Sequence, residues 1–359
     1  MRESLAERLR CTVDLSPLNL EVMYQDGSGH IMTGHLRCRK CHRNYSIREG
    51  VPDLLPECSV VVDGGDLTRL QEATVERFGF EWRHFRDWGW LNNYPDIPDA
   101  QERFYGGLLK HTRAAFWSKS LFREEDLKSG LCVLDAGCGN GRFTSMAAQS
   151  GAEVIGIDLG TGVKSAFEHT REMSNVHIVR GDLFRLPFKD KTFDRVFSIG
   201  VLQHTGNAKA AFDSLVRVLH PGGLIVAHVY GRGRLTYEAI DALIRTITTR
   251  FSIHMQMKFA RITAAITRWM KARKQGEKLY RRVFSHINLL PTEHHMYDWW
   301  AAPIATHHTE DEVCEWFARN GLHILRSNPP ADDIHAQRAR RRWHGAITVL
   351  GRLPVSQRG

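Results

Sequence analysis

The sequence predicts an α/β fold built around a mostly parallel sheet, and two features carry that prediction. Short apolar segments alternate with helical segments from residue 131 to residue 230, the pattern of a parallel sheet covered by helices on both faces. A glycine-rich turn directly follows the first apolar segment. The expected strands are 131–136, 153–158, 176–180, 193–199 and 223–230, then 322–326 and 343–350 after a helix at 309–320 that begins with a capping box.

Composition excludes several classes of protein. The 359 residues are 42% hydrophobic and 25% charged, which is ordinary for a globular chain. No apolar run approaches the ~18 residues of a transmembrane helix, and the first ten residues, MRESLAERLR, contain no signal-peptide core. Seven cysteines are an odd number without an export signal, so we expect free thiols and a cytoplasmic location.

The most informative segment is VLDAGCGNGRF, residues 133–143. Its glycines allow a sharp turn and a close approach by a ligand, and the helix that follows offers free N–H groups to a carboxylate or phosphate. The spacing argues against two common nucleotide sites. A dinucleotide fingerprint that starts at Gly137 needs glycine at position 142, which is Arg142, and the chain has no P-loop pattern.

The segment DAGCGNG resembles motif I of the class I S-adenosylmethionine (SAM) methyltransferases, and four further features follow in the family's order. Asp158 ends VIGID, Asp182 follows the third strand in VRGDLFRLPF, and FDRVFSIGVLQHT and LVRVLHPGG come next. The match is closest to methyltransferase domains of the ubiquinone and menaquinone biosynthesis type. The resemblance implies a Rossmann-like, seven-stranded methyltransferase sheet whose last strand is antiparallel.

The resemblance also implies which residues contact SAM. Asp135 and the glycine turn would meet the methionine moiety, Asp158 the ribose hydroxyls, and Asp182 with Leu183 the adenine. A lone acid at a strand end is more simply a cap, but acids ending three successive strands favour a ligand. The expected cofactor-binding set is Asp135, Gly137, Cys138, Gly139, Gly141, Asp158, Leu159, Asp182, Leu183, Gly200 and Gln203.

His204 follows the fourth strand, where the donor meets the acceptor in this family. It is the best candidate for a catalytic base if the acceptor must lose a proton. The alternative is that His204 only shapes the acceptor site, because family members commonly have histidine there.

A second candidate group lies in HHMYDWWAAPIATHH, residues 294–308, which we expect to be a loop. Tyr297, Asp298 and Trp299 are the predicted acceptor-binding residues, with aromatic rings beside the sulfonium. The alternative is ordinary loop packing. No spacing of the histidines matches a known set of metal ligands.

Residues 1–60 form a predicted zinc-ribbon-like module. Cys38 and Cys41, followed by YSIREGVPDLLP, resemble the small zinc-ribbon partner of tRNA, rRNA and release-factor methyltransferases. That family's first cysteine pair is altered here to Cys11 and Asp14. Zinc on Cys11, Cys38 and Cys41 would need Asp14, His35 or His42 as its fourth ligand; otherwise the fold has kept its shape without metal.

The remaining chain divides into a helical aromatic cap at 61–125, the methyltransferase domain at 126–231 and 291–359, and a basic insert at 232–290. Residues 232–282 hold 13 Lys and Arg against three Asp and Glu, so the chain's formal charge of +9 is concentrated there. Apolar residues recur at helical spacing, and a lid over the acceptor site, the first of three interpretations, would pack that face inward. The set is Leu243, Ile244, Ile247, Phe251, Met255, Phe259, Ile262 and Ile266. A lid over the acceptor, a surface for RNA or membrane, and a solvated face all remain open.

These patterns predict SAM-dependent methyl transfer to oxygen or nitrogen of a small or medium-sized metabolite, with a saccharide or secondary metabolite as the expected class. The local positive charge suits an anionic acceptor, or an anionic surface on which the acceptor is presented. An RNA methyltransferase is the second hypothesis and is less favoured, because Gly200 to Gln203 replace the Asn-Pro-Pro-Tyr run of such enzymes. The third is a non-catalytic SAM-binding module. The patterns do not address oligomeric state.

Overall fold

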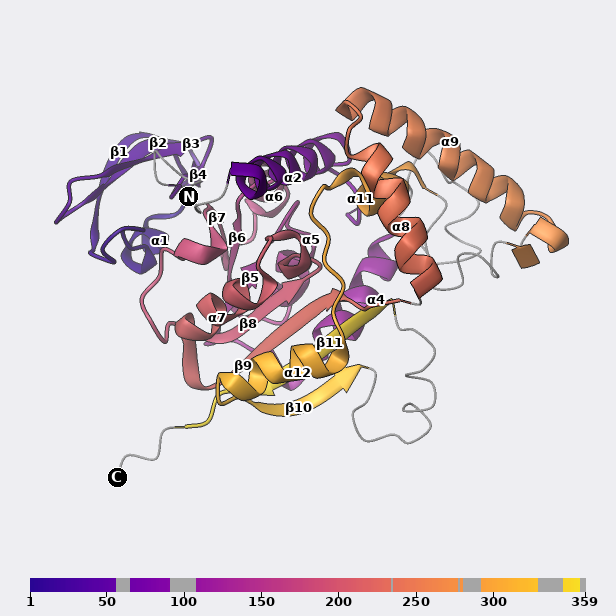
Figure 1. The fold of residues 1–359 in the computed structure, drawn as a ribbon. Helices are drawn as coiled ribbons and strands as arrows, with labels where there is room; N and C mark the ends of the chain where they lie inside the picture. Colours follow the sequence, from indigo (N-terminus) through magenta and orange to yellow (C-terminus); the bar gives the residue numbers. More distant parts are fainter. Residues whose placement is uncertain are drawn as a thin grey trace.

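The computed structural model describes residues 1–55, 65–90, 108–233, 235–276, 278–279, 292–328 and 345–355. A seven-stranded sheet lies at the centre of these residues, and a four-stranded antiparallel sheet lies beside it at the N-terminus (Figure 1).

The seven strands are arranged in the order β10-β11-β9-β8-β5-β6-β7. Only β11 runs against its neighbours, β9 and β10, so the predicted antiparallel last strand is confirmed. Residues 343–344 of the predicted last strand lie outside the described residues. The strands are β5 (Cys132–Ala136), β6 (Glu153–Asp158), β7 (Val176–Arg180), β8 (Phe193–Ile199), β9 (Leu219–Tyr230), β10 (His323–Asn328) and β11 (Ala346–Arg352).

Helices cover both faces of this sheet because its side chains alternate between two apolar cores. Leu134 belongs to one core, with Phe212 and Phe317 from helices, and Val133 to the other, with Phe116 and Phe143. The helices over the first core are α7 (Ala208–Val218) and α12 (Glu310–Arg319), and those over the second are α4 (Leu108–Ser120), α5 (Arg142–Ala148) and α6 (Val163–Thr170). Short 3-10 turns are η1 (Glu124–Asp126), η2 (Leu183–Arg185) and η3 (Leu202–His204).

The N-terminal module has its own sheet but shares the core of the larger domain. Leu9 pairs with Phe188, and Asp53 pairs in parallel with Arg180 at the free edge of β7. Arg180 Nη1 also donates to Asp53 Oδ2 at 2.8 Å. The module therefore covers an edge that would otherwise expose unpaired backbone groups. Its elements are α1 (Glu3–Arg8), β1 (Leu18–Gln25), β2 (Ile31–Cys38), β3 (Asn44–Arg48) and β4 (Val51–Pro52).

Residues 293–301 form helix α11 (Glu293–Ala301), so the prediction of a loop there is wrong. Thr292 caps the helix by accepting a hydrogen bond from the His295 N–H. Met296 and Trp300, four residues apart on one helical face, are buried in an apolar cluster with α2 (Gly65–His84), α8 (Leu235–Thr248) and α9 (Ile253–Lys271). Its aromatic residues have only modest helix propensity, so the helix is stabilised mainly by its tertiary packing.

The predicted packing of the basic insert is also wrong for most of its apolar residues. Side chains on α8 and α9 that were expected to pack inward are exposed, while smaller or polar ones face the protein. Ile244, Phe251 and Phe259 are partly buried as expected. The exposed residues are Leu243, Ile247, Met255, Ile262 and Ile266, all between 49% and 62% accessible.

Candidate SAM and acceptor site

The glycine-rich turn joins β5 to α5, and its conformation requires glycine. Gly137, Gly139 and Gly141 have φ of +93°, +56° and +82°, in the left-handed region. A Cβ on Gly137 would lie 2.2 Å from Val201 Cγ2, which brings the loop after β8 against the turn. The backbone N–H of Gly137 donates to the Ile157 carbonyl at 2.8 Å.

Asp135 is the second-last residue of β5 and is only 2% exposed. Thr144 Oγ1 donates to its Oδ2 at 2.6 Å. Burial nevertheless dominates and raises the pKa of Asp135 to about 7, with Asp158 adding a smaller effect in the same direction. A cationic group on a ligand would favour the ionised carboxylate here.

Asp158 ends β6 and reaches the turn after β5. Its Oδ2 accepts from the Gly139 N–H at 3.0 Å, and its Oδ1 accepts from the Gly160 N–H at 2.7 Å. Burial raises the pKa of Asp158 despite these two bonds. The structure thus brings two of the predicted motifs into direct contact, and each carboxylate oxygen keeps a second lone pair for a ligand hydroxyl.

Asp182 follows β7 and caps η2 by accepting from the Phe184 N–H at 2.9 Å. Burial raises its pKa. Leu183 is 7% exposed and belongs to the apolar core, while Leu159 is partly exposed beside Asp158. Three acids therefore end three neighbouring parallel strands, at one edge of the sheet.

The buried thiol of Cys138 is not suited to act as a nucleophile. Burial raises its pKa well above the usual range, with Asp158 and Asp135 adding to the effect. Gly200, with φ +75°, lets the chain leave β8, and Gln203 is completely buried in η3.

Helix α2 contributes residues that the sequence patterns did not single out. A Cβ on Gly139 would lie 2.9 Å from the Trp82 ring, so this tryptophan covers the glycine turn. Arg142, at the start of α5, places its guanidinium 5.3 Å from the same ring. The density of aromatic residues at 78–90 was visible in the sequence, but its position against the turn depends on tertiary packing.

Glu81 of α2 is fully buried, and His294 Nε2 of α11 lies 2.9 Å from its Oε1. Burial raises the pKa of Glu81 well above its usual range. It also raises the pKa of Asp298, against the opposing effect of Arg142 and Lys119. Burial lowers the pKa of Lys119 to about 8. Charged groups from α2, α4, α5 and α11 therefore share one electrostatic environment beside the glycine turn.

One ring nitrogen of His204 forms a hydrogen bond, and the other has no hydrogen-bond partner among the described residues. Its Nδ1 lies 2.6 Å from the Ile304 carbonyl, so Nδ1 carries the proton and donates. Its Nε2 is buried without a hydrogen-bond partner among the described residues. Burial lowers the pKa of His204 to about 3. The imidazole is therefore neutral at physiological pH, with an available lone pair beside the rings of Phe78 and Tyr230.

The three predicted acceptor residues take different places. Tyr297 is 1% exposed in the helical core, with its hydroxyl donating to the Arg77 carbonyl. Trp299 donates from Nε1 to Asp241 at 3.0 Å and stacks on Tyr230, with ring centroids 4.9 Å apart. Asp298 is the one of the three that joins the buried charged group.

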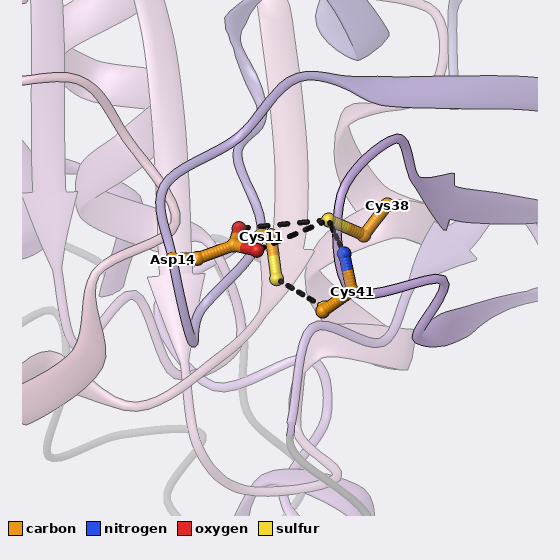
Figure 2. A group of neighbouring side chains, drawn as sticks. All are labelled: Cys11, Asp14, Cys38 and Cys41. Carbon is orange, nitrogen blue, oxygen red and sulfur yellow. Dashed lines mark hydrogen bonds between the residues drawn. The ribbon is translucent and has the colours of Figure 1, made fainter.

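A second cluster lies in the N-terminal module (Figure 2). The ligand atoms of Cys11, Asp14, Cys38 and Cys41 all lie within 4.8 Å of one another. Cys11 Sγ is 3.5 Å from Cys41 Sγ, and Cys38 Sγ is 3.5 Å from Asp14 Oδ1. A tetrahedral zinc with bonds of about 2.3 Å needs sulfur atoms about 3.8 Å apart, so the four groups fit that ion.

The surroundings of the sulfurs differ: burial raises the pKa of Cys11 to about 11, whereas Cys38 has backbone donors. Cys38 Sγ accepts from the backbone N–H groups of Lys40 and Cys41 at 3.3 and 3.4 Å. Of the three candidates for a fourth ligand, the structure places Asp14 in the cluster. His35 instead pairs with Asn44 at 3.0 Å.

The fold and the glycine turn with its strand-end acids are those of a class I SAM methyltransferase domain. Residues 134–227 match the family model described as a methyltransferase domain. Demethylmenaquinone methyltransferase from Staphylococcus saprophyticus is 38% identical over 115 residues, which cover 31% of this chain and 49% of that protein. The Staphylococcus haemolyticus enzyme is 36% identical over 138 residues, which cover 37% of this chain and 57% of that enzyme. The chain thus spans about half the length of these relatives.

Solved structures with similar folds include two methyltransferases. Magnesium protoporphyrin IX methyltransferase from Synechocystis, solved with bound SAH, is 16% identical, with a TM-score of 0.47 and coverage of 80% of this chain and 99% of that one. A complex of a methyltransferase activator and a methyltransferase from Haloferax volcanii gives 18% identity, a TM-score of 0.45 and coverage of 78% and 98%.

Proposed function

We propose that this protein transfers a methyl group from SAM to a small-molecule acceptor. The observation that carries the proposal is the contact of Asp158 with the glycine turn, beside two further strand-end acids. Asp158 would hold the ribose, Asp135 the ammonium of the methionine end, and Asp182 the adenine amine. SAM supplies an activated methyl group, so the protein's task is alignment of the acceptor and exclusion of water.

The acceptor would lie among Tyr230, His204, Asp298 and Glu81, at the ends of β8 and β9 and under α2 and α11. Demethylmenaquinone, in the names of the relatives, supports a small-molecule acceptor over RNA. The chemistry here favours an acceptor with a hydrogen-bond donor for His204 Nε2. We place the reaction in the cytoplasm, in keeping with the free cysteines in the described part of the chain.

The test is production of S-adenosylhomocysteine by the purified protein with panels of phenolic, quinol, saccharide and amine acceptors, and separately with RNA. Turnover with a small acceptor and none with RNA is the expected result. Turnover with RNA alone would contradict the proposed acceptor class. SAM binding without turnover on a cell extract that contains small metabolites and RNA would favour the non-catalytic module.

We expect His204 to position the acceptor rather than to act as its general base, because a group with a pKa of about 3 is a weak base at neutral pH. His204→Ala should lower kcat by roughly tenfold, less than the 10²–10⁴-fold typical of a general base. The pH profile between 5 and 8 should keep its shape in His204→Gln. A loss above 100-fold, together with disappearance of an inflection near neutral pH, would instead assign His204 as the base.

We also propose that Cys11, Asp14, Cys38 and Cys41 bind one zinc ion, which would tie the turn between α1 and β1 to the β2–β3 turn. Protein purified without chelators should contain about one zinc per chain by mass spectrometry. Asp14→Ala should lose most of the metal, and Asp14→Cys, which completes a four-cysteine set, should keep it. His42→Ala, outside the cluster, is the matched control. Metal-free wild-type protein would refute this ligand set.

A further inference from the structure

Helix α9 presents a row of large apolar side chains to solvent. Met255, Ile262, Ile266 and Trp269 are 50%, 59%, 51% and 58% exposed. Their spacings of seven, four and three residues place them on one face of the helix. Single exposed apolar residues are common, but a continuous row on one helix is typical of an interaction surface.

The opposite face of α9 explains why these side chains are not needed for folding. The buried positions are Gln256, Met257, Ala260, Ala264 and Thr267, and all but Met257 are small or polar. The helix packs against α11. Gln256 Nε2 donates to the carbonyls of Thr248 and Ala301. The helix is thus held by its buried face, to which Met257 and Phe259 also contribute, while the exposed row lies outside the core cluster.

Positive charge flanks the apolar row. Lys258 is exposed beside it, and the Arg273 guanidinium lies 4.1 Å from the centre of the Trp269 ring just past the helix end. Arg261 is also exposed, with its guanidinium paired to Glu293 at 3.0 Å. Helix α9 itself contains no Asp or Glu. Figure 1 shows α9 at the periphery, with its C-terminal half far from the seven-stranded sheet. In the described residues, no helix is long and apolar enough to cross a bilayer.

We infer that α9 docks on the surface of an anionic membrane, with its apolar row in the headgroup region and its basic residues against lipid phosphates. A basic amphipathic helix with exposed aliphatic and tryptophan side chains is the chemistry of interfacial binding. A second copy of the chain is a poorer occupant, because pairing two such faces would bring like charges together. RNA would leave the aliphatic side chains without an apolar partner.

Helix α8 gives independent support. Ile240, Leu243 and Ile247 are 42%, 62% and 49% exposed at spacings of three and four residues. Leu235, at the start of the helix, is 89% exposed. Four residues connect α8 to α9, so exposed apolar side chains occur on two consecutive helices.

The test is co-sedimentation of the full chain with vesicles of phosphatidylcholine alone or mixed with phosphatidylglycerol, without SAM or acceptor. Wild type should bind the mixed vesicles and bind the neutral ones at least tenfold more weakly. Ile262→Ser combined with Trp269→Ser should reduce binding at least tenfold. Lys258→Gln combined with Arg273→Gln should reduce it about 25-fold, at about fivefold per charge.

Met23→Ser is the matched control, because Met23 is 63% exposed on the distant strand β1. It should bind vesicles as wild type does, and all variants should keep the wild-type unfolding midpoint. Equal binding by the α9 variants and wild type, or no binding to mixed vesicles, would overturn the inference. So would a dimer in light scattering, or RNA binding, that depends on the α9 residues while vesicles do not bind. Because no turnover is measured, failure here is separate from failure of the proposed methyl transfer.

Discussion

Replacing Asp158 with alanine should reduce SAM affinity by about 100-fold or more in calorimetry. Two hydrogen bonds from ribose hydroxyls to a buried carboxylate contribute about 3–6 kcal/mol together. The carboxylate also accepts from the Gly139 and Gly160 N–H groups, which orient it. Asp158→Asn should retain part of the affinity, since one oxygen remains as an acceptor.

The control for this prediction is Asp190→Ala, which removes an acid that is 60% exposed and paired with Arg217. It should bind SAM like wild type. Thermal unfolding of the Asp158 variants would show whether the fold is retained. Wild-type affinity in folded Asp158→Ala would refute the assignment of this residue to the ribose.

Replacing Gly137 with alanine should destabilise the protein by about 2–5 kcal/mol and impair SAM binding. A left-handed φ costs an L-residue about 1–2 kcal/mol, and forced repacking adds about 1–3 kcal/mol. The new Cβ would lie 2.2 Å from Val201 Cγ2 and 2.8 Å from Val201 Cβ, so rotation of the valine does not remove the overlap. Denaturant unfolding measures the loss.

Gly130→Ala is the matched control, because Gly130 has φ +85° and open space around its Cβ position. Its free energy of unfolding should fall only by the cost of a left-handed φ, about 1–2 kcal/mol, and its SAM affinity should be unchanged. Val201→Ala should partly rescue Gly137→Ala. Equal destabilisation by Gly137→Ala and Gly130→Ala would show that the contact with Val201 has no energetic role.

The strand-and-turn framework was predictable because its signals are local. The apolar strands 153–158, 176–180 and 193–199 have the observed bounds. Strands buried on both faces of a sheet are near-continuous apolar runs, which are easy to recognise. The turn could be predicted from its three glycines, because glycine adopts a left-handed φ more easily than any other residue. Acids at strand ends then meet at one edge because parallel strands share direction.

The helical parts were less predictable, because which face a helix buries depends on what lies against it. The sequence of α9 has helical periodicity, but that periodicity does not say which face is buried. Tertiary packing buries Ala260 and Ala264 and leaves Ile262 and Ile266 exposed. Residues 294–301 lack a strong helical pattern and became helical through burial of Met296 and Trp300.

The sequence alone was sufficient for the class of fold, the glycine turn with its strand-end acids and the three cysteines of the N-terminal module, since each depends on spacing within a short segment. Contacts between distant segments needed the three-dimensional structure. These contacts place Trp82 over Gly139, Glu81 beside His294, and Asp14 rather than His35 or His42 among the cysteines. Each depends on how separate elements pack, and packing is decided by the shapes and volumes of many side chains at once.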